Sequence, residues 1–254
     1  MSAIYNTFKI FNAFSNEFLK KFNFYIESFD NMINLQGKVG LERKELSNLE
    51  ECDQLLIKTY LFIVESANTT AIGAIRLLSS NLYSDAYSLV RILYEILCLT
   101  HWGNVSRENK EELYCSLFKS GLPEEQHYWN EWSLIKKAQK LYESEHEGFV
   151  EIRKKLNNFG GHISRQKIVL GNITSIGDAS ASRIFTPNFG NRHLLAGLDF
   201  THSMFNGILE EYSKHLKEYN AVPPEVENEI KGVAGKFLDN VRPKLQAFID
   251  TSIP

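Results

Sequence analysis

Arg91 and Glu95 are the two residues whose types and spacing most directly suggest chemistry. They stand four positions apart in the apolar run at 84–100, SDAYSLVRILYEILCLT. On a helix this spacing places both side chains on one face, which Tyr94 and Cys98 would press towards a core, so the charges must pair or bind a ligand. An arginine held by a carboxylate can bind phosphate or carboxylate, whereas the same pair can also serve only to hold two helices in register.

A second candidate is His162, which follows the diglycine Gly160–Gly161 in the phrase RKKLNNFGGHISR. Glycine lets the backbone approach a ligand closely, and an imidazole with a pKa near neutrality can act as a general acid or base. Arg153 precedes this histidine and could stabilise negative charge on a phosphate. The alternative interpretation is a loop histidine whose ring donates a hydrogen bond to a carbonyl oxygen.

Two carboxylate–histidine pairs match the spacing of di-iron helical bundles, in which two Glu-x-x-His motifs join lone glutamates from two other helices. The pairs are Glu124 with His127 and Glu143 with His146, and the lone carboxylates would be Glu65 and Glu95. Both pairs look like solvated surface, so we predict no metal site and no cofactor. His193, Asp199 and His202 are likewise expected to be structural.

The run SDAYSLVRILYEILCL, followed later by LNNFGGHIS, resembles a bacterial all-helical family of unknown function. Members of that family have an Arg-x-x-x-Glu helix and a downstream histidine after a short helix. The resemblance covers about residues 45–165. The resemblance implies a helical bundle. It also implies a family that neighbours the HEPN ribonucleases of defence systems.

HEPN ribonucleases cleave RNA without a metal by using a helical arginine and, four to six residues later, a histidine, commonly across a dimer. Here eight residues separate Arg153 from His162, so that motif is not met. A continuous helix would place the two residues about 13 Å apart along its axis, too far to share a phosphate. Only the diglycine break, or Arg91 in place of Arg153, could restore the pairing.

On these grounds the sequence predicts a defence-associated protein with a metal-independent, ribonuclease-like site. His162 would be the general acid or base, and Arg91 or Arg153 would stabilise charge on the phosphate. The substrate-binding residues would be Glu95, Gly160 and Gly161. The alternative is a non-enzymatic sensor or adaptor that binds a protein or a small ligand, with Arg91 and Glu95 as internal ties.

These residues must be positioned by helices, because helical periodicity covers most of the chain. Aromatic residues at spacings of three and four define one stripe over 3–34, which we expect to form part of the core or a dimer interface. Further along the chain, the small residues in SANTTAIGAI would allow a neighbouring helix to approach closely. Pro243 is expected to kink or end the last helix. The sequence thus predicts an all-α single domain, 1–254, with about seven or eight helices.

Helical periodicity is lost only between about 163 and 190. This stretch holds β-branched clusters divided by glycines and serines. Irregular segments of such length are uncommon in compact domains unless they are functional. We therefore expect a small irregular or β-hairpin flap there.

Composition indicates a cytoplasmic protein. The formal net charge of −3, from 28 basic and 31 acidic residues, gives no global positive field, so any RNA contact must be local. Cys52, Cys98 and Cys115 show no paired spacing and are predicted to be buried free thiols. The start does not read as a signal peptide, and no apolar run reaches the roughly 20 residues that span a bilayer. RNA and a second copy of the chain are the expected partners, and no membrane is.

Overall fold

The structure is a computed structural model that describes residues 16–40, 43–80, 82–118, 124–158 and 192–250. Side chains are described in these ranges except at 43–44, 118, 124–131 and 249–250. Every regular element in this part of the chain is helical, which confirms the all-α prediction. The flap predicted at 163–190 lies outside the described residues, as do Gly160, Gly161 and His162.

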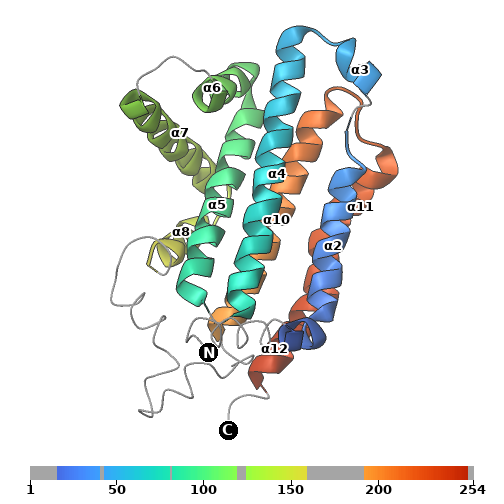
Figure 1. Cartoon of the computed structure of the whole chain (residues 1–254), viewed down its shortest axis with the longest axis vertical. Coiled ribbons are helices and arrows are strands. Elements are labelled where there is room, and N and C mark those ends of the chain that lie inside the picture. The colour runs from blue at the N-terminus through green and yellow to red at the C-terminus, as the bar shows by residue number, and fades with distance from the viewer. Residues whose placement is uncertain (1–15, 41–42, 81, 119–123, 159–191, 251–254) are drawn as a thin grey trace, which may run out of the picture.

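The elements with described bounds follow one another along the chain as shown in Figure 1. They are α2 (Asn23–Gly37), α3 (Arg43–Ser47), α4 (Glu51–Ser79), α5 (Tyr83–Val105), α6 (Arg107–Phe118), α7 (Glu124–Glu145), α8 (Phe149–Leu156), α10 (Arg192–Lys217), α11 (Pro224–Lys236), the π-helical turn η3 (Phe237–Val241) and α12 (Arg242–Asp250). The short α3 and the separate η3 and α12 make these elements more numerous than the periodicity indicated.

Helices α4, α5 and α10 form the centre of the bundle, where each packs against the other two (Figure 1). On one side, α2 and the α11–η3–α12 segment pack on α10. On the other side, α7 and α8 pack on α5, and α6 packs on α4, α5 and α7. Helix α5 therefore has neighbours in both the centre and the α6–α8 layer, so polar residues along it can link the two.

Small residues let the central helices approach closely, as the sequence predicted. Ala67, Ala71 and Ala74 are completely buried on α4. On α10, a Cβ atom added to Gly197 would lie 2.6 Å from a methyl carbon of Leu78, so any larger residue there would force the Leu78 side chain to move. The close crossing of α4 and α10 depends on these small side chains.

Ala71→Leu is expected to lower the free energy of unfolding by about 1–3 kcal/mol, because the packed centre has no space for the added carbon atoms. The matched control is Ile72→Ala, since Ile72 is the next residue and is 52% exposed. That exposed change should alter stability by no more than about 0.5 kcal/mol. Urea unfolding of both variants checks the prediction, and equal losses would contradict it.

The described part of the aromatic stripe packs into the core. Phe18, Phe22, Tyr25 and Phe29 are all nearly or completely buried. The Phe22 ring centroid lies 4.7 Å from that of Phe248 on α12, and the Phe29 centroid lies 4.9 Å from that of Phe205 on α10. This part of the stripe thus fits the core interpretation, and the homodimer stays a prediction.

Pro243 stands next to an interruption of the last helix. It is the second residue of α12, and the π-helical turn η3 directly precedes that helix. Proline has no N–H group, and its ring clashes with the carbonyl four residues earlier, so regular α-helical hydrogen bonding cannot pass through it. The helix absorbs this break as a π-helical turn and then resumes.

Helix α4 is long and apolar enough to cross a membrane by length and composition. Its most apolar 18-residue window has a mean hydropathy of 1.3. The core helix of a soluble protein passes the same test, and α4 lies in the centre of this bundle. A cytoplasmic location stays a prediction.

Candidate functional site

The structure pairs Arg91 with Glu95 within α5. Nε of Arg91 lies 3.1 Å from Oε1 of Glu95, and the two side chains are 22% and 18% exposed. Burial raises the pKa of Glu95, and the nearby guanidinium offsets only part of that effect. The two charges satisfy each other at the edge of the core, which fits the interpretation of this pair as a packing element.

Arg153 has a different partner, Glu143. Its Nε and Nη2 donate to the two carboxylate oxygens of Glu143, the second at 3.3 Å. The hydroxyl of Tyr94 donates to the same carboxylate at 2.6 Å. Arg91 and Arg153 are therefore each engaged with a carboxylate of their own, while His162 lies outside the described residues.

The expectation that Glu143 belongs to the solvated surface is wrong. Its side chain is only 11% exposed, because Tyr94 and Arg153 cover it. The prediction treated ESEHEG as a uniformly charged segment, but the turn between α7 and α8 folds Arg153 back over Glu143. With both oxygens bonded to Arg153, Glu143 does not form a ligand pair with His146.

Other residues considered for chemistry take structural positions. Asp199 lies 3.4 Å from Arg242, and His202 is buried with its ring stacked on Phe237 at 3.8 Å, as the structural interpretation predicted. Glu65 is exposed, and the side chains of Glu124 and His127 are not described. Of the cysteines, Cys98 is buried and Cys115 half-buried. Cys52, in the first turn of α4, is exposed, contrary to expectation.

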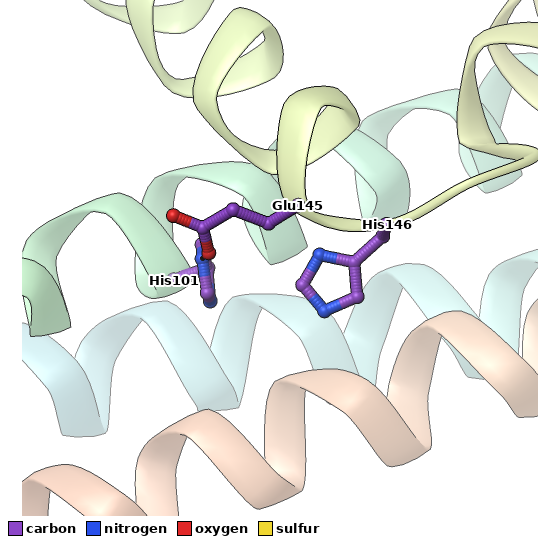
Figure 2. A group of neighbouring side chains, drawn as sticks. All are labelled: His101, Glu145 and His146. Carbon is purple, nitrogen blue, oxygen red and sulfur yellow. Dashed lines mark hydrogen bonds and ion pairs between the residues drawn. The ribbon is translucent and has the colours of Figure 1, made fainter.

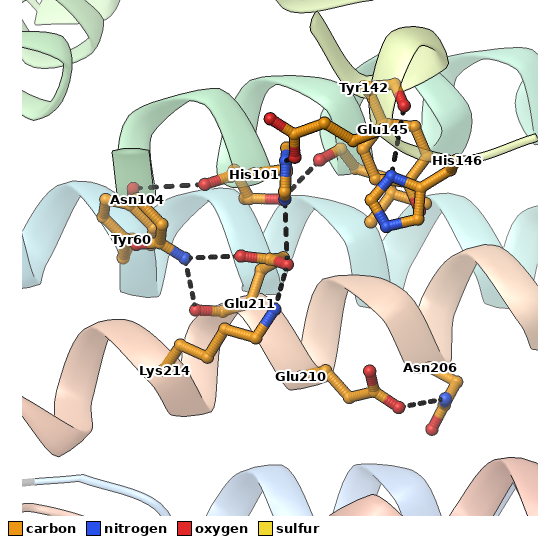
Figure 3. A network of polar contacts seen from close by, with 12 residues as sticks. Tyr60, His101, Asn104, Tyr142, Glu145, His146, Asn206, Glu210, Glu211 and Lys214 are labelled. Carbon is orange, nitrogen blue, oxygen red and sulfur yellow. Dashed lines mark hydrogen bonds and ion pairs between the residues drawn. The ribbon is translucent and has the colours of Figure 1, made fainter. Parts of the chain in front are cut away.

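The most elaborate polar site surrounds His101, which the sequence did not single out. Its imidazole lies between α7 and α10 (Figure 3). Nε2 is 2.8 Å from a carboxylate oxygen of Glu145, and Nδ1 is 3.1 Å from a carboxylate oxygen of Glu211. The hydrogen bond to Glu211 raises the pKa of His101; burial lowers it, but the bond to Glu145 adds to the rise.

Glu211 is a buried carboxylate, 5% exposed, with three donors around it. Nδ2 of Asn104 lies 2.8 Å from one oxygen, and Nζ of Lys214 lies 2.6 Å from the other, which also faces His101. Burial alone would raise the pKa of Glu211, but these three hydrogen bonds outweigh it and lower the pKa to about 2. Glu211 is therefore a fixed negative charge at neutral pH.

His146 approaches the same site from the turn that follows α7. Its Nδ1 lies 3.1 Å from the carbonyl oxygen of Tyr142, and its ring stacks on the Tyr142 ring at 4.1 Å. A carbonyl oxygen only accepts hydrogen bonds, so Nδ1 is the donor, and Nε2 is the ring atom left to bind a ligand. The ring stands at 87° to that of His101, with centroids 5.3 Å apart.

His101, Glu145 and His146 form a group that could hold a metal ion (Figure 2). Each offers one ligand atom, and these atoms lie within 4.8 Å of one another. Two imidazoles and one carboxylate suit Zn²⁺ and related transition metals. Ligand atoms on a tetrahedral Zn²⁺ stand about 3.3 Å apart. An ion would therefore separate Nε2 of His101 from the Glu145 oxygen, now 2.8 Å away, and would draw His146 closer.

Sequence reasoning discussed one of these three residues. It considered His146 only through the Glu143-x-x-His146 spacing, and it predicted no metal site there. The structure directs Glu143 towards Tyr94 and leaves Glu145 to face His101. No local spacing connects His101 to residues 145 and 146, because they are separated by more than 40 positions.

Comparisons with known proteins found no relative of this chain. No family model, curated protein or solved structure matches the chain.

Proposed function

We propose that this chain is a metal-dependent helical-bundle protein whose centre binds a divalent transition-metal ion, with Zn²⁺ as the best match. The ligands are His101 from α5, Glu145 as the last residue of α7, and His146 directly after it. The observation that carries the proposal is the convergence of these three ligand atoms within 4.8 Å.

The hydrogen bonding around the two histidines supports ligation. A metal-binding histidine almost always donates its other ring N–H to a carboxylate or a backbone carbonyl. His101 does so towards Glu211, and His146 does so towards the Tyr142 carbonyl. These supports are the outer contacts that a metal centre needs, and they are already in place.

Three protein ligands would leave a fourth position for water on a zinc ion bound by His101, Glu145 and His146. A zinc ion with such an open position lowers the pKa of its bound water to about 7, which makes hydrolysis of a substrate feasible at neutral pH. Glu145 is 46% exposed, so the carboxylate side of the centre faces solvent. We therefore assign the centre to hydrolytic chemistry.

The full-length protein, freed of metal by dialysis against a chelator, should bind one equivalent of Zn²⁺ or Co²⁺. Co²⁺ should produce the visible absorption of a site with nitrogen and oxygen ligands. Zinc at 100 times its Kd should raise the free energy of unfolding by about 2.7 kcal/mol. Calorimetry and thermal unfolding measure both effects, and the absence of stoichiometric binding would refute the proposal.

Metal-independent RNA cleavage stays a prediction, and so does an adaptor role. Against the first, both candidate arginines are engaged by carboxylates, Arg91 by Glu95 and Arg153 by Glu143. Incubation with labelled tRNA in EDTA separates the two activities. Cleavage in EDTA that His162→Ala abolishes would favour the ribonuclease hypothesis over the metal centre.

A further inference from the structure

Glu211 stands behind the candidate metal centre without belonging to it. It lies on α10, whereas the three ligands come from α5 and the end of α7. It faces Nδ1 of His101, while Glu145 faces Nε2 of the same ring (Figure 3). One carboxylate is buried and the other is 46% exposed, so the two have different surroundings.

We infer that Glu211 is the positioning residue of this centre, holding the Nδ1 proton of His101 so that Nε2 is presented to the metal. The inference rests on the proposed function. A carboxylate bonded to the far nitrogen of a ligating histidine fixes the tautomer, fixes the ring orientation and makes the ligating nitrogen more basic. Glu211 meets each of these requirements through one hydrogen bond.

Asn104, also on α5, helps His101 to hold Glu211 in that position. Asn104 comes three residues after His101, so both side chains point from one face of α5 towards α10. Nδ2 of Asn104 donates to the carboxylate and also to the backbone carbonyl of Glu211, each at 2.8 Å. This second contact ties the carboxylate to its own main chain, which limits its rotation away from His101.

Lys214 completes the arrangement from α10. Its Nζ lies 2.6 Å from the oxygen that faces His101, and its side chain is 61% exposed. The lysine neutralises the buried charge of Glu211. Among the described residues, the Glu211 carboxylate therefore has hydrogen bonds to Asn104, Lys214 and His101. Of these three partners, only His101 is a proposed metal ligand.

Glu211→Gln tests the inference, because it keeps the shape of the side chain and removes the charge. We expect the Kd for Co²⁺ and Zn²⁺ to rise about 10–100-fold. The matched control is Glu210→Gln, since the carboxylate of Glu210 bonds to Asn206 on its own helix. That control should keep its Kd within about twofold, because the hydrogen bond of Glu210 goes to Asn206 and not to His101.

The possible outcomes separate the two proposals. If the wild-type protein binds no metal, the proposed function fails. If the wild type binds and Glu211→Gln binds equally well, only the positioning role fails. Should Glu211→Gln not fold, Asn104→Ala provides the second test, with an expected rise in Kd of about 2–10-fold and a normal thermal unfolding curve without metal.

Discussion

Glu145→Gln is expected to weaken Zn²⁺ and Co²⁺ binding by about 100-fold or more. The change removes an anionic ligand, and the loss of a ligand should exceed the 10–100-fold effect of losing an outer contact. The carboxylate is 46% exposed, and its ion pair with His101 adds little to stability, so the fold should persist. Isothermal titration calorimetry on the metal-free protein measures the loss.

The control for this variant is two residues away. Glu147 is exposed and does not belong to the three-ligand group. Glu147→Gln removes the same charge from the same turn, so it corrects for any general electrostatic attraction of cations. Its Kd should stay within about twofold of wild type. Equal weakening by both variants would show that the metal is held by nonspecific charge and not by a defined centre.

Acidification is expected to destabilise the protein through two buried histidines. Burial lowers the pKa of both His202 and His215 to about 3, with a smaller effect from Lys110 on His215. An unfolded histidine has a pKa of about 6.5, so below that pH the unfolded chain binds protons that the native state excludes. Stability is lost as pH falls from about 6.5 towards 3, by about 2 kcal/mol for each histidine at pH 5.

His215→Phe isolates half of this effect. His215 is completely buried and stacks on Tyr60 at 3.9 Å, and neither ring nitrogen has a hydrogen-bond partner among the described residues. Phenylalanine keeps the stacked ring and cannot be protonated. Relative to wild type, the variant should therefore gain about 2 kcal/mol between pH 7.5 and pH 5.

Urea unfolding at pH 7.5 and pH 5 gives the free energy of unfolding of both proteins. The change in the difference between the two proteins from one pH to the other is the predicted quantity. Carboxyl groups whose pKa values are raised, such as Glu95, Asp199 and Glu210, oppose the trend but are common to both proteins and cancel. His202→Phe should show a similar gain, and the two gains should add, because the residues lie about 20 Å apart along α10. A pH dependence identical to wild type would contradict the prediction.

The sequence by itself determined the all-α class and the inward face of several helices. Apolar spacings of three and four are a property of one helix alone, so the buried aromatic residues of 18–29 and the alanines of α4 could be predicted before any packing was known. The pair of Arg91 with Glu95 was predictable for the same reason, since both ends lie one turn apart on a single helix.

Tertiary structure alone decided which side chains meet across helices. Arg153 reaches Glu143 only because the chain turns between α7 and α8, and His101 meets Glu145 and Glu211 across separations of 44 and 110 residues. Such contacts depend on how each helix is rotated and where it crosses its neighbours. Periodicity fixes which face of a helix is apolar, but the position of a polar residue at the edge of that face becomes meaningful only when the neighbouring helix is in place.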